Sequence, residues 1–136
     1  MDQHRKTWNK RQTEFRDLLL RYDQHQTAIS MFLSQHAQLH IADMAGTEPW
    51  SFEDAVFEGL TDVQSRVIPA NGEHSIAWAI WHIARIEDVT MNILVNGSEQ
   101  VYIRDNWLER MKIAVRSTGN IMDVPQVKAL SQAIRR

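Results

Sequence analysis

The apolar residues of the chain recur mostly at three- and four-residue steps, the spacing of an amphipathic α-helix. The longest such stripe covers about residues 12–42, and no Pro or Gly interrupts it. The pattern therefore predicts one continuous helical stretch there. Its inward face would carry the following residues: Phe15, Leu18, Leu19, Tyr22, His25, Ile29, Phe32, Leu33, His36, Ala37 and His40.

A second long helix is expected from the cap Ser75 to about Val95, because Asn96-Gly97 is a typical helix end. Shorter helices are expected at 52–60 behind the cap Ser51, at about 105–115, and at 124–134 behind Asp123 with Pro125 in the first turn. Residues 66–74 predict a loop, and no alternating strand pattern is convincing. Long striped helices with short connections predict an all-α fold, an antiparallel four-helix bundle.

Length and composition narrow the classes of protein. A chain of 136 residues predicts a single domain spanning 1–136. The net charge is −2 and the Lys and Arg residues are scattered, which argues against a nucleic-acid partner. The absence of Cys excludes disulfides, thiolate ligands and a cysteine nucleophile within this sequence, and it fits a reducing cytoplasm. No apolar run approaches the roughly 18 residues of a membrane span, and the polar segment 1–11 lacks the apolar core of a signal peptide.

The last expected helix has little apolar surface for a bundle of this kind. It offers only Val124, Val127, Leu130 and Ile134. A four-helix bundle would need a fourth full-length helix, and wide apolar stripes left exposed are typical of interfaces. Two explanations stay open: a second copy completes the core, which predicts a homodimer, or the sequence is the N-terminal part of a longer protein.

Three histidines suggest a metal site. His82 lies in the middle of the expected inward face of residues 75–95, on the side shared by Trp78, Ala79, Ile86, Val89 and Ile93. A buried imidazole must find a hydrogen-bond partner or a metal ion. His36 and His40, four residues apart, have the spacing with which a helical pair binds zinc or a similar ion. The alternative is that all three are core histidines satisfied by backbone carbonyls, by carboxylates or by each other. Arg85 and Asp88 face another side and are expected to form salt bridges.

The other histidines are predicted to lie outside this site. His4 belongs to the polar start of the chain and is expected to be solvated, and His74 precedes the cap of the long helix in a structural role. His25 is about 16 Å from His36 along a continuous helix, too far to share an ion.

The string Trp-His-Ile-Ala-Arg-Ile-Glu-Asp at residues 81–88, with Ser-Ile-Ala-Trp at 75–78, resembles the DinB-like superfamily, also called the YfiT-like metal-dependent hydrolases. The resemblance covers roughly residues 30–125. It implies an up-down-down-up four-helix bundle that holds a divalent metal, often nickel or zinc, through three side chains, one of them matching His82. In the family, the other two ligands usually come from an HxxxH or ExxxH pair on the last long helix. This chain departs from that pattern, since no histidine follows His82; His36 and His40 rest on their spacing alone.

Two functions follow from these observations. The resemblance implies a divalent-metal-binding protein that acts as a metal-dependent hydrolase or a thiol-dependent transferase on a small organic substrate. The alternative is a metal-free helical dimerisation module whose histidines are core residues. The metal content of the purified protein separates the two.

Overall fold

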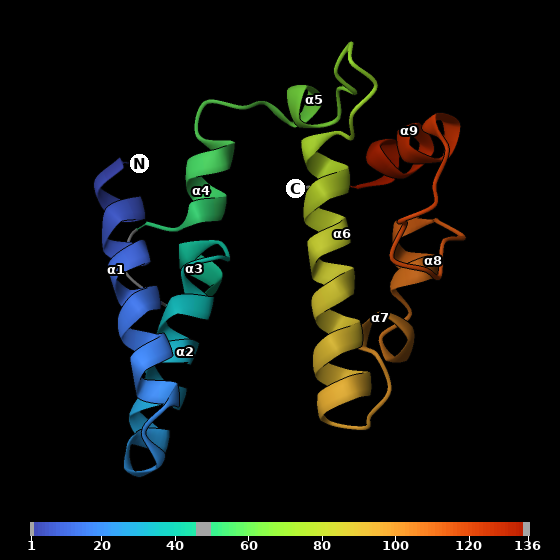
Figure 1. Cartoon of the computed structure of the whole chain (residues 1–136). Helices are drawn as coiled ribbons and strands as arrows, with labels where there is room; N and C mark the ends of the chain where they lie inside the picture. Colours follow the sequence, from blue (N-terminus) through green and yellow to red (C-terminus); the bar gives the residue numbers. More distant parts are fainter. Residues whose placement is uncertain (1, 46–49, 135–136) are drawn as a thin grey trace. The chain divides into compact units, whose positions relative to one another are not determined.

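The computed structural model of the chain describes residues 2–45 and 50–134 (Figure 1). Within these ranges every regular element is helical and no strand occurs, which confirms the all-α prediction. None of the described helices is both long and apolar enough to cross a membrane. The chain divides into two compact units, one ending at Gly59 and the other beginning at Leu60. The four-helix-bundle topology and the single domain stay predictions.

The first unit is built on a helical hairpin. Its elements are α1 (Asp2–Leu19), a short 3₁₀ helix (Tyr22–Gln24) and α2 (His25–Ala37). Helices α1 and α2 run side by side in opposite directions (Figure 1). The prediction of one continuous helix over 12–42 is therefore wrong. The chain turns at Arg21, whose backbone is extended, and folding the stripe back on itself brings the ring of Phe15 to 6.1 Å from that of Phe32.

Polar contacts also join the two helices of the hairpin. Gln35 on α2 is only 2% exposed, and its side-chain oxygen accepts a hydrogen bond from Gln12 at 2.5 Å. Nearby, the guanidinium of Arg11 donates to the hydroxyl of Ser34 at 3.0 Å. A buried amide needs such a partner, because an unsatisfied one costs about 1–3 kcal/mol. Gln35 therefore specifies how α1 and α2 are aligned.

Two short helices follow in this unit, α3 (Ala42–Ala45) and α4 (Phe52–Phe57). Ser51 caps α4 as predicted: its hydroxyl accepts from the Asp54 amide at 3.0 Å and donates to the Asp54 carboxylate at 2.8 Å. His4 is exposed, as expected, but it is not simply solvated. Its ring stacks on Trp50 at a centroid distance of 3.9 Å.

The second unit contains the long central helix. Its elements are α5 (Asp62–Ser65), α6 (Ile76–Asp88), a π-helical stretch (Val89–Val95), α7 (Val101–Arg104), α8 (Trp107–Met111) and α9 (Val124–Ala133). The predicted caps are confirmed, since Ser75 accepts from the Trp78 amide and Asp123 forms a capping box with Gln126. The helix expected over 105–115 is shorter, because Lys112 adopts a left-handed conformation that ends α8.

The core of this unit overlaps the predicted face of α6 only in part, since it includes Trp78 of that face together with Trp81, which lies outside it. It consists of Trp78 and Trp81 from α6 with Val127 and Leu130 from α9. Ile86, expected to pack beside His82, is 43% exposed, Val89 lies outside the core cluster, and His82 is half-buried. The reason is that α6 is apolar almost all round, so hydrophobicity alone does not choose a face.

Two buried hydroxyls join the start of α6 to α9. The Oγ atoms of Ser75 and Ser131 lie 2.7 Å apart, and Ser131 also donates to the Val127 carbonyl at 2.7 Å. Ser131 uses its only proton in that bond, so Ser75 is the donor between the two hydroxyls. The Ser75 oxygen in turn accepts from the Trp78 amide at 3.0 Å. Every donor of this pair is therefore satisfied without water.

Replacing Ser131 with Ala leaves the Ser75 hydroxyl with no acceptor in the core. We expect Ser131→Ala to lower the free energy of unfolding by about 1–3 kcal/mol, measured by urea denaturation. Ser30→Ala, the same change at an exposed position of α2, is the control and should have little effect. Equal effects of the two substitutions would contradict a role for the hydroxyl pair.

Candidate functional site

The imidazole of His82 is held by the backbone of the segment between α8 and α9. Its Nδ1 atom lies 2.6 Å from the carbonyl oxygen of Thr118. A carbonyl only accepts, so in the neutral ring Nδ1 carries the proton and Nε2 keeps its lone pair. Among the described residues, none hydrogen-bonds to Nε2. The ring is thus in the tautomer that ligates a metal through Nε2.

Trp78 limits the movement of this ring. Its indole stacks on the His82 imidazole, with ring centroids 4.6 Å apart and planes inclined by 16°. The prediction that Trp78 lies beside His82 is confirmed. The ring of His74 also packs on the Trp78 indole, with ring centroids 3.8 Å apart, in keeping with the structural role predicted for His74. The indole N–H is directed to the sulfur of Met122 at 3.3 Å, which sets the orientation of Trp78 as well.

One turn further along α6, the predicted ion pair of Arg85 and Asp88 is present and buried. The guanidinium donates to the carboxylate at 2.8 Å and to Gln100 at 2.5 Å, and Arg85 is only 3% exposed. The guanidinium also lies 3.9 Å from the centre of the Tyr102 ring. Burial lowers the pKa of Arg85, while the Asp88 carboxylate opposes that shift. Paired in this way, the guanidinium is charged.

The Asp88 carboxylate holds three further groups. One oxygen accepts from the Asn92 side chain and the Val101 amide, each at 2.8 Å, and the other accepts from the Tyr102 amide at 3.0 Å. Gln100, the N-cap residue of α7, does not cap that helix with its own side chain. The Asp88 carboxylate on α6 instead accepts the hydrogen bonds of the first two amides of α7. Asp88 therefore connects the start of the π-helical stretch with the start of α7.

The other two predicted ligands lie together in the first unit. The rings of His36 and His40 are 4.8 Å apart, and each offers a ring nitrogen within 4.8 Å of the other's. His40 is not on the helix, which ends at Ala37, but the turn that follows keeps the rings adjacent. Two bonds of about 2 Å to a common ion need nitrogens no more than about 4 Å apart, so a shared ion requires the two rings to present their nearest nitrogens to it. A site that joins this pair to His82 stays a prediction.

A profile of the DinB superfamily matches residues 52–136. The chain belongs to the DinB superfamily. No curated protein and no solved structure matches it. The matched region contains His82 and Thr118, whereas His36 and His40 lie outside it; the assignment of all three histidines as ligands stays a prediction.

The contact between the Thr118 carbonyl and His82 could not be predicted from the amino-acid sequence. Every residue has a backbone carbonyl, so no residue type in the sequence indicates which carbonyl a distant side chain will contact. The only available signal was Gly119, which has φ +90° and packs against α6. The role of Gly119 depends on its contacts with Trp78 and Trp81, which are distant from it in the sequence.

Asp88→Asn should destabilise the second unit strongly. The amide removes the charge that compensates Arg85 and turns an N–H donor toward groups that are themselves donors. Breaking a buried pair in this way costs about 3–5 kcal/mol, which urea denaturation would measure. Asp105→Asn is the control, since Asp105 pairs with Arg104 on the surface at 2.8 Å and is 41% exposed; little change is expected there. A loss no larger than that of the control would show that the Arg85 pair is not needed.

Proposed function

We propose that this DinB-superfamily protein binds a divalent metal ion through Nε2 of His82 and acts as a metal-dependent hydrolase or thiol-dependent transferase on a small organic substrate. The observation that carries the proposal is the 2.6 Å contact between Nδ1 of His82 and the Thr118 carbonyl. Histidines that ligate metals almost always donate their other ring N–H to a carbonyl, a carboxylate or water. The hydrogen bond from Nδ1 to the Thr118 carbonyl leaves Nε2 as the nitrogen that binds the ion and fixes the orientation of the His82 ring.

The surroundings of the ring fit this role. Stacking on Trp78 fixes the plane of the imidazole and covers one of its faces with an apolar surface. Imidazole nitrogens suit zinc and nickel among the divalent ions. When bound, such an ion is a Lewis acid that lowers the pKa of a coordinated water or thiol and so supplies a nucleophile near neutral pH. His36 and His40, whose rings lie side by side, stay the predicted further ligands, and a homodimer stays the predicted assembly.

The alternative is a metal-free helical module. The same two contacts also fit this alternative, because the Thr118 carbonyl accepts from the donor nitrogen of His82 and the rings of His36 and His40 meet each other edge to face. In that case the histidines would be structural, and the protein as purified would hold no stoichiometric metal. The two hypotheses therefore differ in a measurement that needs no substrate.

His82→Ala should abolish stoichiometric binding of zinc or nickel. Metal content after purification and titration calorimetry with each ion would measure it. His25→Ala is the matched control, because His25 is an exposed histidine at the start of α2 and should bind as the wild type does. His36→Ala and His40→Ala should weaken binding if the pair supplies the further ligands. Unchanged binding in His82→Ala would refute the proposal.

Metal affinity should fall as the solution becomes more acidic. An imidazole ligates only when neutral, so protons compete with the ion below neutral pH and binding releases them. In the acid limit the dissociation constant should rise by about one decade per pH unit for each histidine that ligates. Titrations from roughly pH 8 to pH 5, the range in which histidine changes charge, would count the ligands. A pH-independent affinity would exclude histidine ligation altogether.

A further inference from the structure

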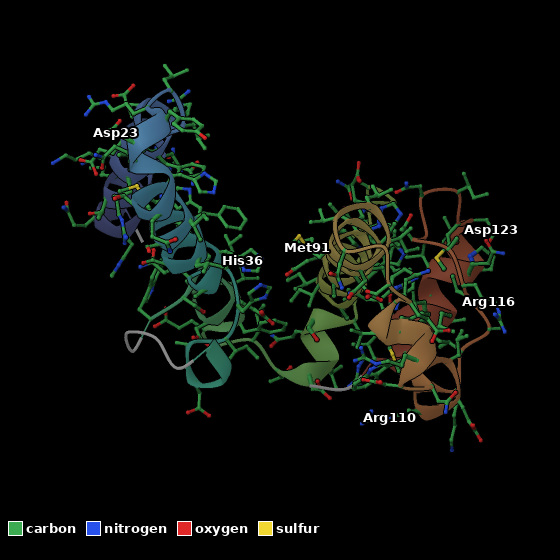
Figure 2. All side chains as sticks on the ribbon, turned by 90° about the horizontal axis from the view of Figure 1, so that it is seen from below. Asp23, His36, Met91, Arg110, Arg116 and Asp123 are labelled. Carbon is green, nitrogen blue, oxygen red and sulfur yellow. The ribbon has the colours of Figure 1, made fainter. Side chains whose placement is uncertain are left out.

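The segment of residues 115–119 lies along α6 and is held there by side chains of the second unit. Three of its carbonyls accept hydrogen bonds: Val115 from the Tyr102 hydroxyl at 3.0 Å, Arg116 from the Arg85 guanidinium at 3.2 Å, and Thr118 from the His82 ring at 2.6 Å. The side chain of Arg116 itself points outward (Figure 2). The backbone of the segment, rather than its side chains, is therefore what α6 and α7 hold.

Gly119 sets how closely this segment approaches α6. A Cβ atom at this position would lie 2.8 Å from Cζ3 of Trp81, 3.3 Å from Cζ2 of Trp78 and 3.4 Å from the sulfur of Met122. Contacts under 3.0 Å do not occur for real Cβ atoms, so a side chain here would push the backbone away from the indoles. The Thr118 carbonyl, one residue earlier, would move with it.

The other glycines among residues 2–45 and 50–134 do not show this close approach. Gly59, Gly72 and Gly97 also have positive φ angles, but a Cβ atom at any of them would meet nothing within 4 Å. Their conformation explains those three glycines. At Gly119 the conformation and the contact with two indoles act together, and this separates it from an ordinary turn glycine.

We infer that Gly119 and Tyr102 are positioning residues for His82. Gly119 lets the 115–119 segment lie against the indoles of α6, and the Tyr102 hydroxyl fixes the same segment through the Val115 carbonyl. Together they place the Thr118 carbonyl so that His82 keeps its proton on Nδ1 and its lone pair on Nε2. The importance of this arrangement for metal binding rests on the proposed function, but the arrangement itself exists in the metal-free protein.

The test measures the tautomer of His82 directly in the metal-free protein. Ring ¹⁵N shifts of labelled histidine, recorded near pH 8 where imidazoles are neutral, distinguish a proton on Nδ1 from one on Nε2. The wild type should show His82 with the proton on Nδ1. Gly119→Ala should lose this signature, and its zinc affinity should fall about 10- to 100-fold, the usual effect of removing such a partner. Gly72→Ala is the matched control, with φ +80° and open space around the new Cβ, and should keep the wild-type signature.

Two further variants separate positioning from general damage. Trp81→Phe in the Gly119→Ala background removes the Cζ3 atom that the new Cβ would meet, so the Nδ1–H signature should return. Tyr102→Phe deletes only the hydroxyl that holds Val115 and keeps the ring beneath Arg85. Tyr102→Phe should shift the His82 tautomer in the same direction as Gly119→Ala. If Gly119→Ala does not fold, the tautomer in Tyr102→Phe alone tests whether the 115–119 segment positions His82.

The outcomes of the two proposals are distinct. An unchanged His82 tautomer in Gly119→Ala, or in Tyr102→Phe, overturns the inference for that residue. A loss of the signature in Gly72→Ala equal to that in Gly119→Ala overturns it as well, because strain rather than contact would then be the cause. Zinc titration of the wild type tests the proposed function independently, since the tautomer can respond as expected in a protein that binds no metal.

Discussion

A charged guanidinium inside a protein needs an opposite charge and hydrogen bonds, and the two terminal nitrogens of Arg85 obtain them from its own helix and from segments that are distant in the sequence. Asp88 lies on the same helix, Gln100 precedes α7, the Arg116 carbonyl precedes α9, and the Tyr102 ring lies under the guanidinium. Each partner fixes the segment that carries it. The segments that carry Gln100, Tyr102 and Arg116 are therefore ordered around one buried charge, beside the apolar core that Trp78 and Trp81 of α6 form with Val127 and Leu130 of α9.

The same constraint explains why an irregular segment, and not a helix, lies beside His82. The carbonyls of an α-helix are used within the helix, so they are poor acceptors for side chains. After α8 ends at the left-handed Lys112, residues 115–119 keep their carbonyls free, and Tyr102, Arg85 and His82 bind three of them. The loss of regular structure in this part of the chain is what provides a backbone acceptor for the imidazole.

The local features of this fold were predictable, whereas the packing was not. Ser51, Ser75 and Asp123 were found as helix caps because a cap depends on a residue and its next three neighbours. The hairpin was missed because the stripe over 12–42 contains no breaker, and the turn at Arg21 is stabilised by contacts across the hairpin such as Gln12 with Gln35. The buried face of α6 was predicted only in part, since Trp78 was placed on it and Trp81 and Arg85 were not; apolar residues surround most of that helix, so their pattern does not select one face.

That His82 is a ligand stays a prediction, whereas the family could be predicted from the sequence: the string around His82 indicated the DinB superfamily, and the match over residues 52–136 confirms it. The Thr118 carbonyl could not be predicted, and it bears on the choice between a metal ligand and a satisfied core histidine. A neutral imidazole has one donor and one acceptor nitrogen, and a carbonyl satisfies only the donor. The contact that a core histidine needs is thus the same contact that prepares a ligand, and it leaves Nε2 as an acceptor with no hydrogen bond from any described residue. Finding a partner for His82 does not weigh against a metal ion; it determines which nitrogen would bind one.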